Sequence, residues 1–244
     1  MLFFSSLLSS SPTDHTWQRA GPGDERSPCP ALNTMANYGY IPRDGKNIKF
    51  WHMIHALQAV YNLSLPLALF LAIPGYLLCG SWFRMSVNLA DLALHNRLEH
   101  DASLVHANTP EGAARAPTRV DPALMHSFLH ACPVGRGFRL EDFAKVRVVR
   151  EAKLPPGKAL DAFHAEVSRG ESALSWLLMK DDDRNEVPLE RIRQWFGEER
   201  LPEDWKKPSQ PLGLITTRET AVEVKKLIAS IRHSGAMDLL PVKR

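Results

Sequence analysis

A chain of 244 residues, 44% of them hydrophobic and 23% charged, is long enough to bury a full core and has the composition of a soluble globular protein. Its net charge of +3 is small and no basic stripe alternates with aromatic residues, which argues against a nucleic-acid-binding protein. Three cysteines (Cys29, Cys79 and Cys132) exclude a disulfide framework, and their odd number leaves at least one free or bound to a ligand.

The first ten residues are apolar and rich in serine, but they lack a basic start and the apolar run is short for a secretion signal. We expect residues 1–20 to form an N-terminal tail or the remnant of a signal. The domain itself is then expected to span residues 21–244.

Cys29 lies between two prolines, at the start of a short amphipathic segment. Pro28 favours an extended chain, and Pro30 suits the first position of a helix, where its missing N–H costs nothing. The free amides and the positive end of that helix would point back at the sulfur and favour a thiolate. The sequence therefore predicts that Cys29 is a metal ligand or a nucleophile, with a buried structural cysteine as the alternative.

Residues 65–79 are almost continuously apolar. The stretch is shorter than the roughly 20 residues that a membrane span needs, and it contains Pro66, Pro74 and Gly75. We therefore expect two short buried helices in the wall of an apolar pocket.

The remaining chain shows helical periodicity separated by loops rich in proline and glycine. We detect no internal repeat and no convincing pair of strands, so the expected fold is all-α, a single compact multi-helix domain with long proline-rich loops. Helices are expected at residues 46–63, 85–99, 122–132, 140–151, 158–179, 187–199 and 217–231.

The segment around Cys29 resembles the opening signature of the fungal haem-thiolate peroxidases, which comprise chloroperoxidase and the unspecific peroxygenases. Tyr38 stands where a histidine would be expected, a departure that concerns packing near the haem edge more than the ligand. The resemblance implies an all-α domain that encloses haem b, with the Cys29 thiolate bound to the iron. The matching residues are Pro28-Cys29-Pro30, Leu32-Asn33, Ala36-Asn37 and Gly39-Tyr40-Ile41-Pro42-Arg43-Asp44-Gly45.

Glu99-His100-Asp101-Ala102-Ser103 forms an oxygen-rich corner that suits a hard cation, although such acidic residues are often only solvated. The segment is similar to the cation-site motif of the same family. That similarity implies Mg²⁺ (or Mn²⁺) bound by the Glu99 carboxylate, the His100 carbonyl and the Ser103 hydroxyl, with a haem propionate. The His100 side chain would then face the distal pocket, with Asp101 fixing its tautomer.

Peroxide cleavage needs a group that takes a proton from one oxygen and returns it to the other. A carboxylate in an apolar pocket suits this task, because burial raises its pKa toward the working pH. Glu171 shares a helical face with Val167 and Leu174, whereas Glu166 lies on a more polar face. The pair Gly170-Glu171 also resembles the surroundings of the acid–base glutamate in the shorter family members. We expect Glu171, assisted by His100, to be the acid–base group, and a partly exposed helix charge is the alternative.

The resemblance implies an H₂O₂-dependent peroxygenase that inserts oxygen into C–H bonds or alkenes through a haem-thiolate ferryl intermediate. The expected pocket lining of Leu98, Val167 and Leu174 is aliphatic, which favours aliphatic or bulky substrates. The alternatives are a haloperoxidase with the same residues and a non-catalytic haem-binding module. Secretion is expected because most of the family is secreted, and a homodimer could form if Cys79 or Cys132 is exposed.

Overall fold

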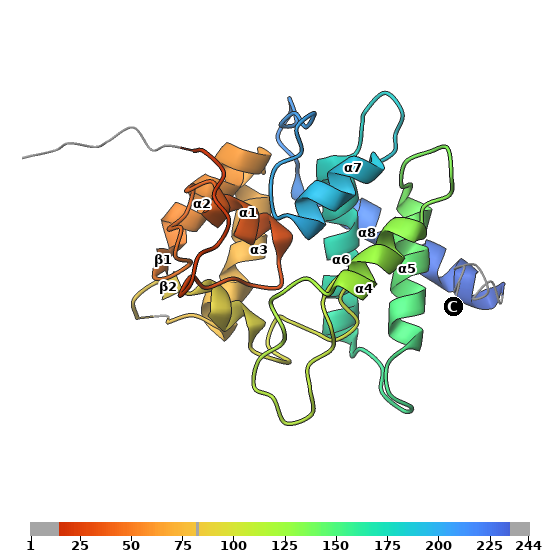
Figure 1. Ribbon diagram of the computed structural model, residues 1–244, viewed down its shortest axis with the longest axis horizontal. Coiled ribbons are helices and arrows are strands. Elements are labelled where there is room, and N and C mark those ends of the chain that lie inside the picture. The colour runs from red at the N-terminus through yellow and green to blue at the C-terminus, as the bar shows by residue number, and fades with distance from the viewer. Residues whose placement is uncertain (1–14, 82, 235–244) are drawn as a thin grey trace, which may run out of the picture.

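The computed structural model describes residues 15–81 and 83–234, and this part of the chain contains eight α-helices and one two-stranded sheet. Figure 1 shows two groups of elements: α1 to α3 with the sheet at one end, and α4 to α8 at the other. The prediction of an all-α fold is confirmed. Among the described residues, no helix is both long enough and apolar enough to cross a membrane.

The N-terminal group starts where the prolines around Cys29 predict. The bounds of its elements are α1 (Pro30–Asn37), β1 (Ile48–Lys49), α2 (Phe50–Tyr61), α3 (Leu65–Leu78) and β2 (Ser86–Val87). The prediction that the chain has no strand pair was wrong, because β1 pairs antiparallel with β2.

The two helices predicted for residues 65–79 are one helix, α3, with Pro74 inside it. Ser64 caps its first turn by accepting a hydrogen bond from the amide of Leu67. Its outer face is exposed, so the prediction of a fully buried segment is also wrong.

A helix over residues 85–99 was wrongly predicted as well. Met85 and Asn96 have positive φ angles of 46° and 59°, which no regular helix accommodates. The only helix in this described stretch is a short 3₁₀ helix, η1 (Leu89–Ala93), which follows β2. The residues that follow η1 are therefore loop, which sets the His100 segment on irregular chain.

The C-terminal group is a helical layer in which α8 packs along α5 and α6. Its elements are α4 (Pro122–His130), α5 (Leu140–Ala152), α6 (Ala162–Met179), α7 (Leu189–Ile192), the π-helical turn η2 (Arg193–Gly197) and α8 (Leu214–His233). All of them overlap helices that the periodicity predicts.

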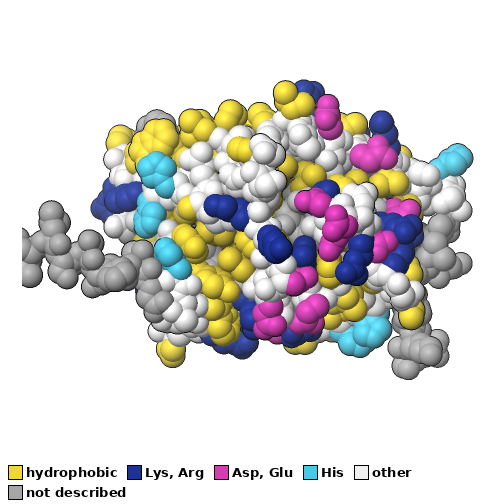
Figure 2. All heavy atoms as spheres, turned by 90° about the horizontal axis from the view of Figure 1, so that it is seen from above, with side chains coloured by type: hydrophobic (Ala, Val, Ile, Leu, Met, Phe, Trp, Pro, Cys, Tyr) yellow, Lys and Arg dark blue, Asp and Glu magenta, His cyan; other side chains and the backbone are white. Residues whose placement is uncertain are grey.

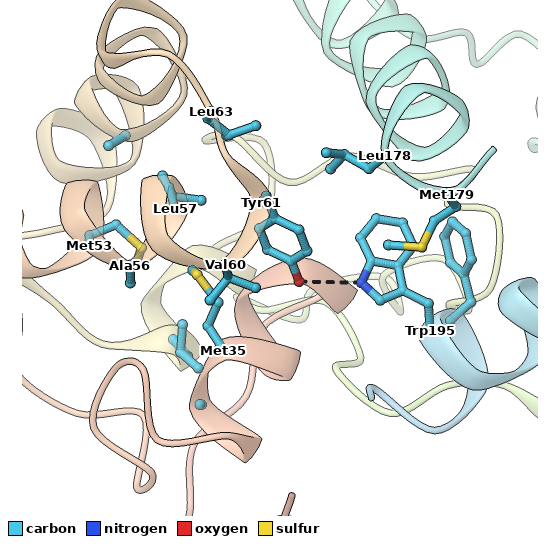
Figure 3. Packing of buried hydrophobic residues seen from close by; sticks show 14 of the residues in the cluster. Met35, Met53, Ala56, Leu57, Val60, Tyr61, Leu63, Leu178, Met179 and Trp195 are labelled. Carbon is cyan, nitrogen blue, oxygen red and sulfur yellow. Dashed lines mark hydrogen bonds between the residues drawn. The ribbon is translucent and has the colours of Figure 1, made fainter. Parts of the chain in front are cut away.

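The main hydrophobic core joins the two groups. Figure 3 shows Tyr61 of α2 facing Trp195 of η2, with Trp195 Nε1 donating to the Tyr61 hydroxyl at 3.4 Å. The Tyr61 hydroxyl in turn donates to the carbonyl of Ala31 at 3.0 Å. This chain of contacts fixes the first turn of α1, and therefore Cys29, against the core.

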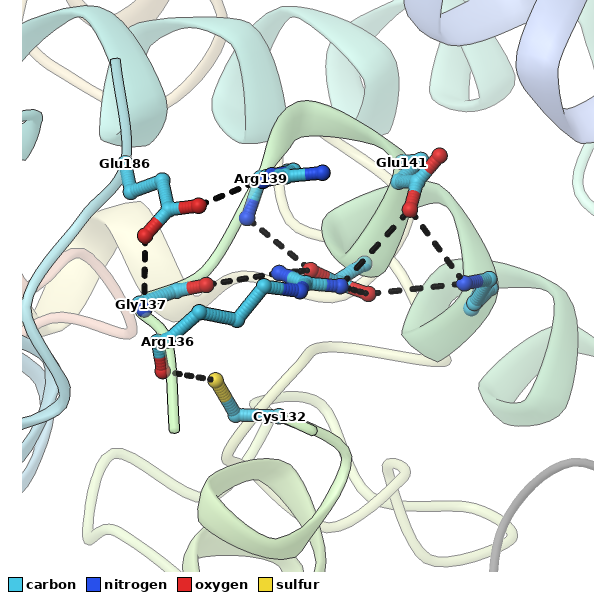
Figure 4. A network of polar contacts seen from close by, with 8 residues as sticks. Cys132, Arg136, Gly137, Arg139, Glu141 and Glu186 are labelled. Carbon is cyan, nitrogen blue, oxygen red and sulfur yellow. Dashed lines mark hydrogen bonds and ion pairs between the residues drawn. The ribbon is translucent and has the colours of Figure 1, made fainter. Parts of the chain in front are cut away.

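A polar network anchors the start of α5 (Figure 4). Arg136 forms an ion pair at 2.5 Å with the fully buried carboxylate of Asp142, and Asp142 also accepts from the amide of Arg139 at 2.9 Å. Glu186 accepts from the Gly137 amide at 2.9 Å and from Arg139 Nε at 2.8 Å. These bonds tie α5 to the segment that precedes α7.

Residues 1–14, which include most of the expected tail or signal, lie outside the described residues. The rest of that segment packs on the domain. The His15 ring stacks on Tyr40 at 3.8 Å, and Trp17 Nε1 donates to the carbonyl of Glu199 at 3.2 Å.

Candidate active site

Cys29 immediately precedes α1 in an extended conformation, with φ −93° and ψ 113°. The amides of Leu32 and Ala31 hydrogen-bond to its sulfur, as expected for a residue at a helix N-terminus. Its side chain is exposed, whereas Cys79 is buried and Cys132 is half-buried. The structure therefore presents one accessible thiol at the start of a helix.

The expectation that this position favours a thiolate is wrong for the chain alone. Burial raises the pKa of Cys29 to about 11 and outweighs the lowering by the Leu32 and Ala31 amides. The charges of Glu171 and Glu199 raise it further. The Cys29 thiol is thus accessible and yet surrounded by protein, and Glu171 is close enough for its charge to act on it.

A polar clamp that the sequence did not reveal holds the Cys29 loop. Asn33 Nδ2 donates to the Ser27 carbonyl at 2.7 Å and to Glu199 Oε1 at 2.6 Å, while Asn33 Oδ1 accepts from the Ser27 amide. Asn37 Nδ2 donates to the carbonyl of Glu199 at 3.0 Å. Burial raises the pKa of Glu199. Through these bonds the asparagines of the motif tie the Cys29 loop to Glu199, which lies 166 residues after Asn33 in the chain.

Glu171, on α6, lies beside His100, which the following loop residue orients. Glu171 Oε2 is 3.4 Å from His100 Nε2, and His100 Nδ1 donates to the backbone carbonyl of Asp101 at 2.7 Å. The His100 ring is buried, whereas 55% of the Glu171 side chain is exposed. Asp101 thus contacts His100 through its main chain, and its carboxylate accepts instead from the Thr109 amide at 2.8 Å.

The pKa of the Glu171 carboxyl is lowered, so the expectation that burial would raise it is wrong. Burial does act in the raising direction, but the neighbouring His100, assisted by the charge of Arg147, outweighs it. Reciprocally, burial lowers the pKa of His100, but Glu171 raises it by more, and the net direction is upward. Each group therefore shifts the pKa of the other toward its charged form.

A further histidine, His164 of α6, lies near this pair. Its ring centroid is 6.1 Å from that of His100, and His164 Nδ1 is 2.8 Å from Asp161 Oδ2. His164 Nε2 is buried and has no hydrogen-bond partner among the residues that the structure describes. Within α6, His164 is seven residues before Glu171, a helical spacing that could have singled it out from sequence.

The other residues proposed from sequence fall into two groups. Leu98, Val167 and Leu174 are half-buried, and Leu98 and Leu174 pack against the main core. Glu166 forms an ion pair at 2.6 Å with Arg169, and 60% of its side chain is exposed. Glu166 therefore sits on the outer face of α6, away from the His100–Glu171 pair.

In the acidic corner, oxygen atoms of Glu99 and Ser103 contact histidine side chains. Glu99 Oε2 is 2.9 Å from His95 Nδ1, and ligand atoms of His95, Glu99 and Asp101 lie within 4.8 Å of one another. Burial raises the pKa of Glu99. The Ser103 hydroxyl instead lies 3.2 Å from His106 Nδ1. His95 is a further residue that sequence analysis did not include in this corner.

Two arginines of α5 fasten the loop that carries these residues. Arg147, fully buried, donates from Nη1 to the carbonyl of Ala102 at 2.7 Å. Arg150 donates from Nε to the carbonyl of Ser103 at 2.5 Å and from Nη2 to the carbonyl of His106 at 3.1 Å. The loop is therefore bound to a helix rather than left free in solvent, which fixes His100 against Glu171.

His106 makes the folded state sensitive to acid. Burial lowers its pKa to about 4, from an ordinary value of 6.5. Between these values the unfolded state binds a proton that the folded state does not, so the stabilisation is complete above pH 6.5 and is lost as the pH falls toward 4. We expect His106 to account for about 3 kcal/mol of the loss in unfolding free energy.

The measurement is urea unfolding at pH 7 and pH 4. The His106→Asn variant should lose about 3 kcal/mol less than the wild type over this interval. His126→Asn, which removes an exposed histidine, is the matched control and should behave as the wild type does. Equal losses in the wild type and the His106→Asn variant would contradict the assignment.

Comparison with known proteins gives consistent similarities. The family model described as peroxidase, family 2, matches residues 15–210. Chloroperoxidase of Leptoxyphium fumago is 30% identical over 224 residues, which cover 83% of this chain and 60% of the relative.

Shorter matches involve other fungal enzymes. Dothistromin biosynthesis peroxidase dotB of Dothistroma septosporum is 36% identical over 117 residues, covering 41% of this chain and 28% of the relative. Aromatic peroxygenase of Cyclocybe aegerita is 39% identical over 67 residues, covering 28% of this chain and 18% of the relative. The chain thus spans less than two thirds of the length of each of these relatives.

Proposed function

Because the chain belongs to peroxidase family 2, the fungal haem-thiolate peroxidases, we propose that it is an H₂O₂-dependent peroxygenase that carries haem b on Cys29. Its reaction would insert oxygen into C–H bonds or add oxygen to alkenes of organic substrates. The observation that supports the proposal is an accessible Cys29 thiol within reach of the charge of Glu171. Glu171 acts electrostatically on the Cys29 thiol and is paired with His100.

The residues around Cys29 fit a haem. The Cys29 thiol is accessible, and two helix amides point at it and can stabilise a thiolate. Coordination to a metal deprotonates a thiol outright, which overcomes the raised pKa of Cys29. When bound, the haem supplies an iron whose thiolate ligand favours heterolytic cleavage of the peroxide O–O bond. Leu98, Val167 and Leu174 would line the apolar part of the site.

The proton transfers fall to Glu171 and His100. Because its pKa is lowered, Glu171 is ionised at neutral pH and accepts a proton from H₂O₂ at a carboxylate oxygen. It then returns this proton to the departing oxygen, which leaves as water. His100 donates through Nδ1 to the Asp101 carbonyl, so that Nε2 stays directed at Glu171, and its proximity lowers the pKa of that carboxyl.

The acidic corner would bind Mg²⁺ or Mn²⁺ next to the haem. Glu99, the His100 carbonyl and Ser103 remain the proposed ligands, and the proximity of His95 and Asp101 to Glu99 supports a cation at this corner. A divalent ion would compete with His95 for the Glu99 carboxylate. Secretion from the cell and acceptance of aliphatic or bulky substrates complete the proposal.

A haloperoxidase is the second candidate, because the similarity to chloroperoxidase extends over 83% of the chain. It would use the same cysteine and the same acid–base pair. Chloride-dependent chlorination of a dimedone-type substrate at acid pH would favour it, whereas oxygenation without chlorination favours the peroxygenase.

The absorption spectrum of the purified protein, reduced under carbon monoxide, tests the proposal first. We expect a strongly red-shifted Soret band, which indicates haem with a thiolate ligand. A band at the position typical of histidine ligation would contradict Cys29 as the ligand. Absence of bound haem after reconstitution would contradict the proposal as a whole, including the third possibility of a haem-binding module without turnover.

A further inference from the structure

Helix α3 has an outer face that is as apolar as its inner one. The helix contains no charged residue, and its buried side packs on the core through Leu67, Ala72 and Tyr76. On the opposite side Phe70 is 60% exposed and Leu77 is 55% exposed. Residues spaced by three and seven lie in one stripe of a helix, so Phe70, Ile73 and Leu77 form a continuous row about 10 Å long.

Two further exposed aromatic residues lie in the segments that flank α3. Trp51 lies in the first turn of α2, and Phe83 follows α3 with a fully exposed side chain. The Phe50 amide donates to the Met85 carbonyl at 3.0 Å, and the rings of Phe50 and Tyr76 lie 5.1 Å apart. These contacts bring the start of α2, the end of α3 and the residues before β2 into one region.

The same region is rich in positive charge. Lys46, Lys49 and Arg84 are exposed, and none of them forms an ion pair with any residue that the structure describes. Lys49 Nζ lies 3.4 Å from the Arg84 carbonyl, so two of these residues are adjacent. The sequence has no Asp or Glu from residue 45 to residue 90, although the whole chain has 27.

Figure 2 agrees with the uneven distribution of acidic residues, although Lys and Arg appear over both halves of this face. The end of the molecule formed by α1 to α3, at the left of the view, shows hydrophobic, histidine and basic side chains, whereas Asp and Glu gather over the other half. A single apolar residue on a protein surface needs no explanation, but a contiguous apolar row edged by cations is typical of an interaction site.

We propose that this surface binds the headgroup region of a bilayer that contains anionic phospholipid. The lipid-binding surface consists of Trp51, Phe70, Ile73, Leu77, Leu78 and Phe83, with Lys46, Lys49 and Arg84 at its edge. The core-facing side of α3 keeps the helix flat against the protein, so its outer row can enter only the interfacial layer, where aromatic and aliphatic side chains are stable. The cations would contact lipid phosphates at the anionic surface.

A second copy of the chain fits this surface less well. A second copy of this surface offers Lys46, Lys49 and Arg84 no carboxylate from residues 45–90 with which to pair. An anionic lipid surface instead satisfies both the apolar row and the cations.

Flotation of the full-length holoenzyme with vesicles tests the proposal. We expect binding to phosphatidylcholine vesicles that contain phosphatidylserine, weaker binding at high salt, and little binding to phosphatidylcholine alone. Lys49→Glu combined with Arg84→Glu should reduce the partition coefficient by about tenfold or more. Phe70→Ser combined with Leu77→Ser should reduce it similarly without removing any charge.

The matched controls make the same kinds of substitution outside the lipid-binding surface. Lys153→Glu with Lys158→Glu reverses two exposed charges in the α5–α6 loop, and Val134→Ser removes an exposed apolar side chain near α4. Both should bind vesicles as the wild type does, and haem content should be unchanged in every variant. Failure of the wild type to bind, or equal binding to both vesicle types, overturns the proposal.

Two further outcomes also overturn it. If the Phe70 and Leu77 substitutions leave vesicle binding intact, another part of the chain, such as residues 1–14, is responsible. If sedimentation velocity shows a dimer that these substitutions dissociate, the surface joins two copies instead. Neither outcome bears on the haem spectrum, so the proposed function is tested separately.

Discussion

Replacing Glu171 with glutamine is expected to lower the rate of peroxide activation by about 10²–10⁴-fold, the range typical of a lost acid–base group. Glutamine keeps the size of the side chain and an oxygen that can accept a hydrogen bond, but it cannot take a proton from H₂O₂. The haem spectrum of the variant should equal that of the wild type, because Cys29 is untouched. Stopped-flow absorbance after mixing with H₂O₂ measures the rate directly.

Glu166→Gln is the matched control, since it makes the same change about one and a half turns earlier in α6. Glu166 is exposed and paired with Arg169, and an exposed pair contributes at most about 1 kcal/mol to stability. We expect its peroxide kinetics to match the wild type. A Glu171→Gln variant that retains wild-type rates, or a Glu166→Gln variant that loses them, would show that the acid–base group is misassigned.

The sequence predicted the parts of the fold that depend on local rules. Pro30 starts α1 because proline has no amide to satisfy in the first turn, and this requires nothing from the rest of the chain. The single helix α3 escaped prediction because Pro74 lies inside it, where a proline usually ends or kinks a helix. The prediction of a helix over residues 85–99 was wrong because apolar spacing does not reveal backbone angles. The spacing in this stretch fits a helix, but the positive φ angles of Met85 and Asn96 do not.

In the candidate site, too, features set by local sequence could be predicted, and features that depend on distant segments could not. Cys29, Glu171 and His100 were identified from short motifs, and the structure places Glu171 beside His100. The directions of the pKa shifts could not be predicted, because they are sums over groups that folding brings together. His100 and Arg147 lower the pKa of Glu171 against its burial, and two helix amides fail to offset the burial of Cys29. The Glu199–Asn33 bond has no local signal at all, since it joins distant segments.

Replacing Cys29 with alanine is expected to remove the red-shifted Soret band of the reduced carbon monoxide complex. The reason is that no other thiol can take its place. Cys79 is buried, and the Cys132 thiol donates to the carbonyl of Arg136 at 3.2 Å, in the polar network before α5. Peroxide-dependent oxygenation should fall to the level of free haem, because the electron donation that favours O–O cleavage is lost with the thiolate.

Cys132→Ala is the matched control, as it removes a half-buried thiol outside the site and should leave both spectrum and activity unchanged. The change at Cys29 should leave the fold intact, because the side chain is exposed and α1 begins at Pro30 whichever residue precedes it. Circular dichroism can confirm this before the spectra are compared. Since the polar clamp of Ser27, Asn33 and Glu199 makes no use of the sulfur, the loop should keep its shape in the variant. A Cys29→Ala protein that kept the red-shifted band would therefore place the iron ligand elsewhere, and the proximity of Glu171 to Cys29 would no longer support a catalytic role.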